Sequence, residues 1–334
     1  MYLNGKKVLF IAPRFFGYEK LIKEELEEQG ATVDYHDDRP SGDFFTKALI
    51  RVDRRLLNRK TDLYYRTIVE TSRGRNYDHI FIVRAEAISA VKLNELRAAH
   101  PKARVTLYLW DSMNYNPNAK QLLDHFDSVW SFDRADADAF EKVHFLPLFY
   151  ANGFAETSYP AKHIEYDACF IGTMHTNRYK VLEKIIDQLQ SRGIKYFIYC
   201  YYPSRTLFRL RSLLDPGFRR FGRRYLKFES IPLSKTIEYF EISRLIIDIN
   251  RPAQRGLTMR TIEAFGARRK LLTTNKDVVN YDIYDPSWVH LTDRNNPMLS
   301  EDFNKKEPVF DQSIWEKYSV RRWTETIFTL NSAL

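Results

Sequence analysis

The chain has 334 residues, of which 44% are apolar, enough for two hydrophobic cores of roughly 150 residues each. It lacks the roughly 18 to 20 consecutive apolar residues of a membrane span, and its start lacks a signal-peptide cleavage pattern. The net charge of +9 favours anionic partners, and the two cysteines and eight histidines show no metal-ligand spacing. We therefore expect a cytoplasmic protein with free thiols, without a disulfide framework, metal or cofactor.

Residues 1–150 alternate apolar runs with amphipathic segments, as in proteins that have a parallel sheet covered by helices on both faces. The pattern predicts strands at 6–12, 31–37, 78–85, 103–111, 127–133 and 144–150, and helices at 17–30, 87–101, 119–126 and 134–143. This order predicts a Rossmann-like domain, although a GxGxxG fingerprint is missing.

Residues 151–165 are polar, contain Gly and Pro, and are interpreted as a linker. The alternating pattern then restarts across a second Rossmann-like domain, 166–310. Strands are predicted at 166–173, 195–202, 244–250 and 270–275, and helices at 178–193, 234–243 and 258–267. The tail, 311–334, has helical periodicity and is expected to pack back on the first domain.

The segment 205–227 holds eight Lys and Arg residues against one Asp, interleaved with Leu and Phe. Clustered cations with apolar neighbours favour an anionic membrane surface or a lipid-linked phosphate, which gives a peripheral location on the inner face of the plasma membrane. A solvated basic helix pair is the alternative. Nucleic acid is not expected as a partner, because the sequence contains none of its recognition motifs.

Ligands of open α/β sheets bind beyond the carboxyl ends of the strands, so the residues that follow each strand are candidate site residues. In the first domain these are Arg14, Phe16 and Gly17 on the acceptor side, with Glu86 and Asp111 as candidate catalytic carboxylates. In the second domain they are Gly172, Thr173, His175, Arg178 and Asn250. For Asp111 the alternative is a helix cap, and for His175 it is solvent exposure.

The stretch 251–275 is interpreted as an anion and ribose site. Gly256 allows close approach of the backbone, and Thr258 is placed to cap a helix that begins near Met259. Arg260 and Glu263 stand at (i, i+3) spacing on one helix face, suited to a phosphate and a diol. The alternative is a simple ion pair between them.

A resemblance supports this interpretation. The segments "IPLSKTIEYFEISRLIIDIN" and "RGLTMRTIEAFGARRKLLTTN" resemble the donor half of GT-B glycosyltransferases, and "YLWDS", "FDSVWSFDRADA" and "FLPLFY" are similar to the N-terminal domain of the CgeB-like, lipopolysaccharide-biosynthesis branch. The resemblance implies two Rossmann-like domains that face each other across a cleft.

The resemblance also implies roles for single residues. It places Glu263 on the nucleotide ribose, and Gly172 and Arg178 on the phosphates. It places Ile231, Pro232 and Leu233 by the base and Gly256, Leu257 and Thr258 by the diphosphate or sugar. Arg255 stands where the common retaining pattern has a glutamate, which leaves the donor sugar and the stereochemistry open.

The resulting hypothesis is a metal-independent glycosyltransferase that uses a nucleotide-sugar donor and a glycan or lipid-linked acceptor in cell-surface polysaccharide biosynthesis. Arg178, Arg260 and helix N-termini would stabilise the leaving phosphate, and Asp111, or else Glu86, would be the general base. An epimerase, or a non-catalytic spore-coat-like protein of the same fold, is the alternative.

Overall fold

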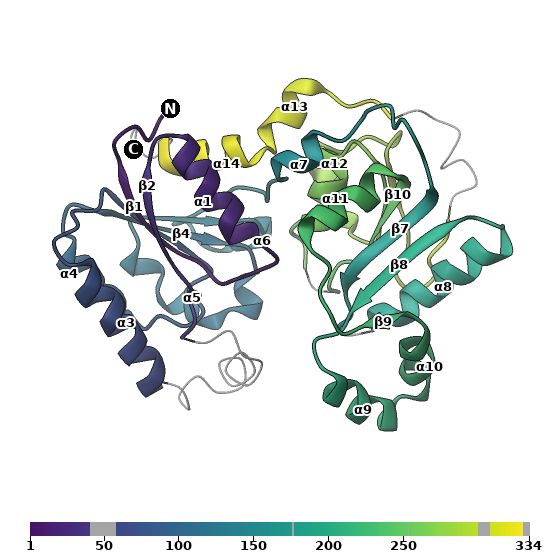
Figure 1. Cartoon of the computed structure of the whole chain (residues 1–334), viewed down its shortest axis with the longest axis horizontal. Coiled ribbons are helices and arrows are strands. Elements are labelled where there is room, and N and C mark those ends of the chain that lie inside the picture. The colour runs from purple at the N-terminus through teal and green to yellow at the C-terminus, as the bar shows by residue number, and fades with distance from the viewer. Residues whose placement is uncertain (41–57, 176, 253, 300–307, 330–334) are drawn as a thin grey trace. The chain divides into compact units, whose positions relative to one another are not determined.

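The computed structural model describes residues 1–40, 58–175, 177–252, 254–299 and 308–329 (Figure 1). The chain divides into two compact units, one formed by Met1–Pro147 with the segment from Val320 onward, the other by Leu148–Ser319. The segment interpreted as a linker, 151–165, therefore counts with the second unit. Each unit holds a sheet of six parallel strands, as the alternating pattern predicts for Rossmann-like domains.

The first unit has the strand order β2-β1-β3-β4-β5-β6. Its strands are β1 (Lys7–Ile11), β2 (Thr32–His36), β3 (His79–Val83), β4 (Arg104–Leu109), β5 (Ser128–Ser131) and β6 (Val143–Phe145). Its helices are α1 (Tyr18–Glu28), α3 (Asn58–Ser72), α4 (Ala90–Ala99), α5 (Pro117–Gln121), α6 (Arg134–Ala139) and α14 (Val320–Thr329), with short 3-10 helices η2 (Met113–Tyr115) and η3 (Leu123–His125).

Alternate side chains of the central strands pack on opposite faces of this sheet. Leu9, Ile80 and Ile82 join apolar residues of α3, α4 and α5 in one core. On the other face the buried Trp323 of α14 packs edge-on against Phe81 and Tyr108, with ring centroids 5.9 and 4.6 Å apart. Figure 1 shows α1 and α14 side by side in this unit.

The second unit has the order β9-β8-β7-β10-β11-β12, the arrangement of dinucleotide-binding Rossmann sheets. Its strands are β7 (Tyr166–Thr173), β8 (Tyr196–Tyr201), β9 (Leu226–Lys227), β10 (Ser243–Asp248), β11 (Lys270–Thr273) and β12 (Val289–Leu291). Its helices are α7 (Asn152–Ala155), α8 (Arg178–Ser191), α9 (Arg205–Leu214), α10 (Pro216–Tyr225), α11 (Leu233–Glu241), α12 (Met259–Gly266) and α13 (Gln312–Lys317), with the 3-10 helix η4 (Lys276–Asn280).

Several elements differ from the sequence prediction. α3, β9 and β12 are not predicted, the expected helix 119–126 is α5 followed by η3, and the strand expected at 144–150 ends at Phe145. The tail is two helices in different units, because the helical pattern breaks between Lys317 and Val320. Among the described residues, no helix is long and apolar enough to cross a bilayer.

Candidate functional site

The switch point of the second sheet lies between β7 and β10, where the strand order reverses. The loop after β7 folds back on its own strand, since Nη1 of Arg178 donates to the carbonyl of Thr173 at 2.9 Å. Gly172 allows this approach. A Cβ there would lie 3.4 Å from Nη1 of Arg178 and 3.1 Å from the ring of Phe170. Arg178 is thus held at the N-terminus of α8, where free N–H groups favour an anion.

Three arginines surround His175 at this edge of the sheet: Arg178, Arg251 and Arg294. Burial, together with these positive charges, lowers the pKa of His175 to about 2, so its imidazole is neutral at physiological pH. Burial also lowers the pKa of Arg178 to about 10, and the neighbouring arginines add to the shift. We call these four residues the arginine cluster. Such concentrated positive charge is suited to a multiply charged anion.

Hydrogen bonds hold Arg294 in this cluster from a distant part of the sequence. Its Nη1 donates to the carbonyl of Asn250 at 2.6 Å, and its Nη2 donates to Oδ1 of Asn177 at 2.9 Å. The Nε atoms of Arg178 and Arg294 are buried and find no hydrogen-bond acceptor within the described residues. Buried N–H donors are usually hydrogen-bonded, so these two atoms are candidate donors to an anion bound at this edge.

Asp248, at the end of β10, is a carboxylate near Arg178, and its charge opposes the lowering of the Arg178 pKa. It is buried and accepts hydrogen bonds from the hydroxyls of Thr261 at 2.9 Å and Thr273 at 3.3 Å. Asp248 thus compensates part of the positive charge of Arg178 and Arg294. The sequence analysis did not select Asp248 or Arg294, whereas Arg251 opens the stretch 251–275 that it interpreted as an anion site.

The loop before α12 has a defined backbone. Thr258 caps the helix as predicted, since its hydroxyl accepts from the N–H of Thr261 at 3.2 Å. The carbonyl of Gly256 accepts from the side-chain amides of Gln254 and Asn275, at 3.0 and 3.2 Å. Leu257, within this loop, is buried.

Arg255, which replaces the glutamate of the retaining pattern, is half exposed, and its Nη2 lies 3.2 Å from Oδ1 of Asp277. Part of its charge is therefore compensated within the protein.

Arg260 and Glu263 form the ion pair that the sequence analysis left as the alternative. Nη1 of Arg260 lies 2.5 Å from Oε2 of Glu263, and the carboxylate side chain is only 3% exposed. The guanidinium also stacks 5.0 Å from the ring centre of Phe240 on α11. Arg260 thus points toward α11, and a ribose contact by Glu263 stays a prediction. Ile231, Pro232 and Leu233 lie between β9 and the first turn of α11.

In the first unit, one arginine brings the two predicted catalytic carboxylates together. Nη2 of Arg84, which follows β3, lies 3.1 Å from Oε1 of Glu86 and 3.2 Å from Oδ2 of Asp111, which follows β4. The negative charges raise the pKa of Arg84 despite its burial. Asp111 is the more accessible carboxylate, with 24% of its side chain exposed against 10% for Glu86.

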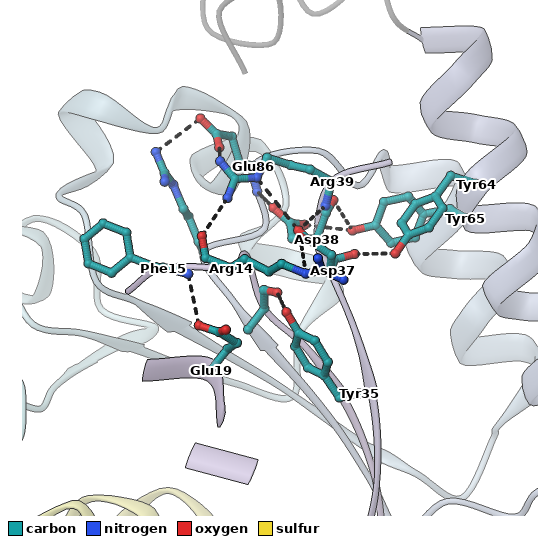
Figure 2. Close-up of polar contacts among 12 residues, drawn as sticks. Arg14, Phe15, Glu19, Tyr35, Asp37, Asp38, Arg39, Tyr64, Tyr65 and Glu86 are labelled. Atoms are coloured by element: carbon teal, nitrogen blue, oxygen red, sulfur yellow. Dashed lines mark hydrogen bonds and ion pairs between the residues drawn. The ribbon is translucent and has the colours of Figure 1, made fainter. Parts of the chain in front are cut away.

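Figure 2 shows a network beside these carboxylates that the sequence analysis missed, because the predicted strand ended at Asp37 and residues 38 and 39 were given no role. Asp38 is fully buried and accepts from the hydroxyl of Tyr65 at 2.7 Å and from the N–H of Glu86 at 2.9 Å. Burial raises its pKa to about 6. Arg39 donates to the carbonyl of Arg14 at 3.3 Å, so the network joins the loops after β1, β2 and β3.

The backbone of this edge is strained at three residues that are not glycine. Arg84 and Ala85 have φ angles of 79° and 52°, and Phe16 has 54° just before Gly17 at 89°. The side-chain amide of Asn116 donates to the carbonyl of Arg84 at 2.5 Å and holds Arg84 in this conformation. Such conformations cost about 1 to 3 kcal/mol each and cluster at functional sites.

Phe15 and Phe16, each 40% exposed, form an edge-on ring pair in the loop after β1. The ring of Phe15 also lies 5.5 Å from that of Trp110, which precedes Asp111.

Within the described residues, no group of three or more His, Cys, Asp or Glu side chains is arranged to hold a metal ion. A metal-independent mechanism stays a prediction.

No protein-family model matches this chain, and no curated protein matches it either. Solved structures do match. An α,α-trehalose-phosphate synthase (UDP-forming) from Burkholderia xenovorans, in complex with glucose-6-phosphate, is 11% identical with a TM-score of 0.63, covering 96% of this chain and 98% of that one. Anabaena HepE in complex with UDP and glucose is 12% identical with a TM-score of 0.58, covering 98% and 100%.

A third match, the UDP-GlcNAc 2-epimerase of Methanocaldococcus jannaschii in complex with UDP-GlcNAc and UDP, is 12% identical with a TM-score of 0.53, covering 96% and 99%. At such identities the similarity establishes the fold alone. The chain has the GT-B fold of two Rossmann-like domains, which confirms the predicted fold class. The particular branch of that fold stays a prediction.

Proposed function

We propose that this protein is a glycosyltransferase that uses a nucleotide-sugar donor. The observation that carries the proposal is the arginine cluster at the β7/β10 switch point, where nucleotides bind in Rossmann sheets. Three guanidinium groups and the N-terminus of α8 suit a pyrophosphate, because guanidinium groups and free helix N–H groups both donate hydrogen bonds to phosphate oxygens. The fold neighbours add support, since the M. jannaschii epimerase binds UDP-GlcNAc and UDP, and Anabaena HepE binds UDP and glucose.

In this proposal the arginines stabilise the nucleoside diphosphate as it leaves the sugar. Charge develops on the leaving oxygen in the transition state, and fixed guanidinium donors interact more strongly with it there than in the ground state. This role requires no metal ion. His175, neutral among the arginines, is able to donate one N–H to a phosphate oxygen without adding a fourth positive charge.

On the acceptor side, Asp111 is the better candidate for the general base. Its carboxylate is the more exposed of the two that Arg84 bridges, so an acceptor hydroxyl reaches it more readily than it reaches Glu86. Glu86 is then a positioning residue that Asp38 anchors through the backbone. We propose that the acceptor is a glycan or a lipid-linked glycan of cell-surface polysaccharide biosynthesis, and that the protein works in the cytoplasm.

An epimerase acting on a nucleotide sugar is the second candidate. Sugar-nucleotide epimerases are among the fold neighbours, and the first unit holds more carboxylates near its switch point than the sequence analysis recognised. The two functions differ in one requirement. An epimerase converts the nucleotide sugar without a second substrate, whereas a transferase releases the nucleotide in proportion to acceptor.

The first test is a thermal-shift screen with UDP, GDP, CMP, dTDP and ADP. A ligand at a hundred times its dissociation constant stabilises the folded state by about 2.7 kcal/mol. Arg294→Ala should weaken the binding of whichever nucleotide stabilises the wild type by about tenfold or more, since a charged hydrogen bond to phosphate contributes about 1.5 to 3 kcal/mol. Arg192→Ala is the matched control, because Arg192 lies at the opposite end of α8.

Equal weakening in both variants, or no stabilisation by any of the five nucleotides, would contradict the proposed donor site. If one nucleotide binds, sugar conjugates of that nucleotide are then incubated with the protein in the absence of an acceptor. Epimerisation under these conditions favours the second candidate, and release of nucleotide only when a glycan is added favours the first.

A further inference from the structure

α9 and α10 form a helical hairpin between β8 and β9, and its outer helix carries an exposed apolar stripe. Leu210, Leu213 and Leu214 are 57%, 78% and 89% exposed. Their spacing of three and four residues places them on one face of α9. Figure 1 shows α9 at the outer end of its unit, beyond α10. Three leucines this exposed on one helix face indicate a surface that meets an apolar partner.

The hairpin is a fixed part of the second unit. Phe218 and Phe221 of α10 are buried, and the guanidinium of Arg211 lies 4.0 Å from the ring centre of Phe218. A Cβ at Gly222 would lie 2.3 Å from the ring of Phe208, so the glycine allows α9 and α10 to pack closely. The leucines are therefore exposed although their helix is well packed on its other side.

Arginines border the leucines. Arg205 and Arg209 are exposed on α9, and the exposed face of α10 adds four more: Arg219, Arg220, Arg223 and Arg224. Among these four, Nη2 of Arg220 lies 3.5 Å from Oε1 of Glu183, and both side chains of that pair are partly exposed to solvent. A surface pair of this kind contributes little, so the positive charge of the hairpin is largely uncompensated.

We infer that the hairpin is a membrane-docking element, which inserts Leu210, Leu213 and Leu214 among the lipids while the arginines bind anionic headgroups. Leucines beside arginines on one short helix fit the boundary between headgroups and acyl chains. A nucleic acid would engage the arginines but leave the leucines in water. A second copy of the chain would oppose six arginines with six arginines. The inference shares no residue with the proposed donor site.

The test uses the full chain with two kinds of vesicle, phosphatidylcholine alone and an equimolar mixture with phosphatidylglycerol. In co-sedimentation the protein should bind the mixed vesicles and not the neutral ones, and added salt should weaken binding. Replacing Arg205 and Arg209 by Gln should weaken binding by about fivefold per residue, the effect of one basic residue near an anionic surface. Replacing the three leucines by Ser should weaken it by at least about tenfold.

Matched controls come from the first unit. Leu63 and Val91 are 60% and 64% exposed, and Arg66 and Arg73 are exposed cations. Leu63→Ser with Val91→Ser, and Arg66→Gln with Arg73→Gln, remove the same kinds of group from another surface and should leave vesicle binding unchanged.

Insertion is measured with an environment-sensitive fluorophore on a new cysteine. The two native cysteines are buried, so Leu213→Cys is labelled selectively. Its fluorescence should rise on mixed vesicles, whereas a label at Leu63→Cys should not respond. Absence of binding to mixed vesicles, equal losses in the control variants, or tighter binding to RNA that survives the leucine substitutions would overturn the inference. Nucleotide stabilisation should be the same in all hairpin variants, so failure of the donor site is detected separately.

Discussion

Acidification should destabilise the second unit through His175. The imidazole has a pKa of about 2 in the folded protein, against an ordinary value of 6.5 in the unfolded chain. A depressed pKa contributes stability that is complete above about pH 6.5 and is lost as the pH falls toward the folded value, because only the unfolded chain then takes up the proton. The loss amounts to about 1.4 kcal/mol for each pH unit below 6.5.

Between about pH 7.5 and pH 5 this loss comes to roughly 2 kcal/mol for a fully desolvated group. His175 is partly exposed, and solvent screening reduces the expected value to about 1 to 2 kcal/mol. This loss of stability is expected as long as the pKa of His175 in the folded protein lies well below 5. Asp38 acts in the opposite direction. Its pKa is raised from 3.8 to about 6, so its contribution grows as the pH falls through that range and partly masks His175 in the wild type.

The assay therefore compares the wild type with His175→Gln by urea unfolding at both pH values. The free energy of unfolding of the variant, minus that of the wild type, should increase by about 1 to 2 kcal/mol on acidification, since only the wild type loses the histidine contribution. A bound nucleoside diphosphate should shrink the difference, because its negative charge raises the pKa of His175. Identical pH dependence in the two proteins would refute a neutral, partly buried imidazole among arginines.

Two further predictions concern the site and the packing. Asp111→Asn should leave nucleotide binding intact and abolish turnover, whereas Glu263→Ala should weaken nucleotide binding. Titration calorimetry measures the nucleotide affinity of both variants. Equal losses of affinity would contradict the assignment of Asp111 to catalysis and Glu263 to donor binding. Gly266→Ala should lower the free energy of unfolding by about 1 to 3 kcal/mol, because its Cβ would lie 2.4 Å from Cγ of Tyr150. Gly217→Ala is the control, because the nearest atoms to its added Cβ lie 3.4 Å away. If urea unfolding shows the same loss of unfolding free energy in both variants, the packing at Gly266 is not tight.

Hydrophobic periodicity identified most of the parallel strands, and the placement of polar residues directly after strands selected Glu86, Asp111, Gly172 and Arg178 as site candidates. The strands and the site candidates could both be predicted because each depends only on residues close together in the sequence. A strand buried on both faces is a continuous apolar run, and the residue after it stands at the sheet edge whatever the strand order. The cap at Thr258 was predictable for the same reason, since it depends on two neighbouring turns of chain.

Two features of the candidate site depend on contacts between distant residues. Arg294 joins the loop after β7 through Asn177, 117 positions away, and Asp38 holds the backbone of Glu86, 48 positions away. Strand order decides which loops meet at an edge, and it arises from pairings such as β7 with β10, between which β8, β9 and four helices intervene. The sequence therefore determined most of the elements and many of the residues at their ends. Only the tertiary structure decided which of those ends lie together, because strand pairing and side-chain burial are long-range.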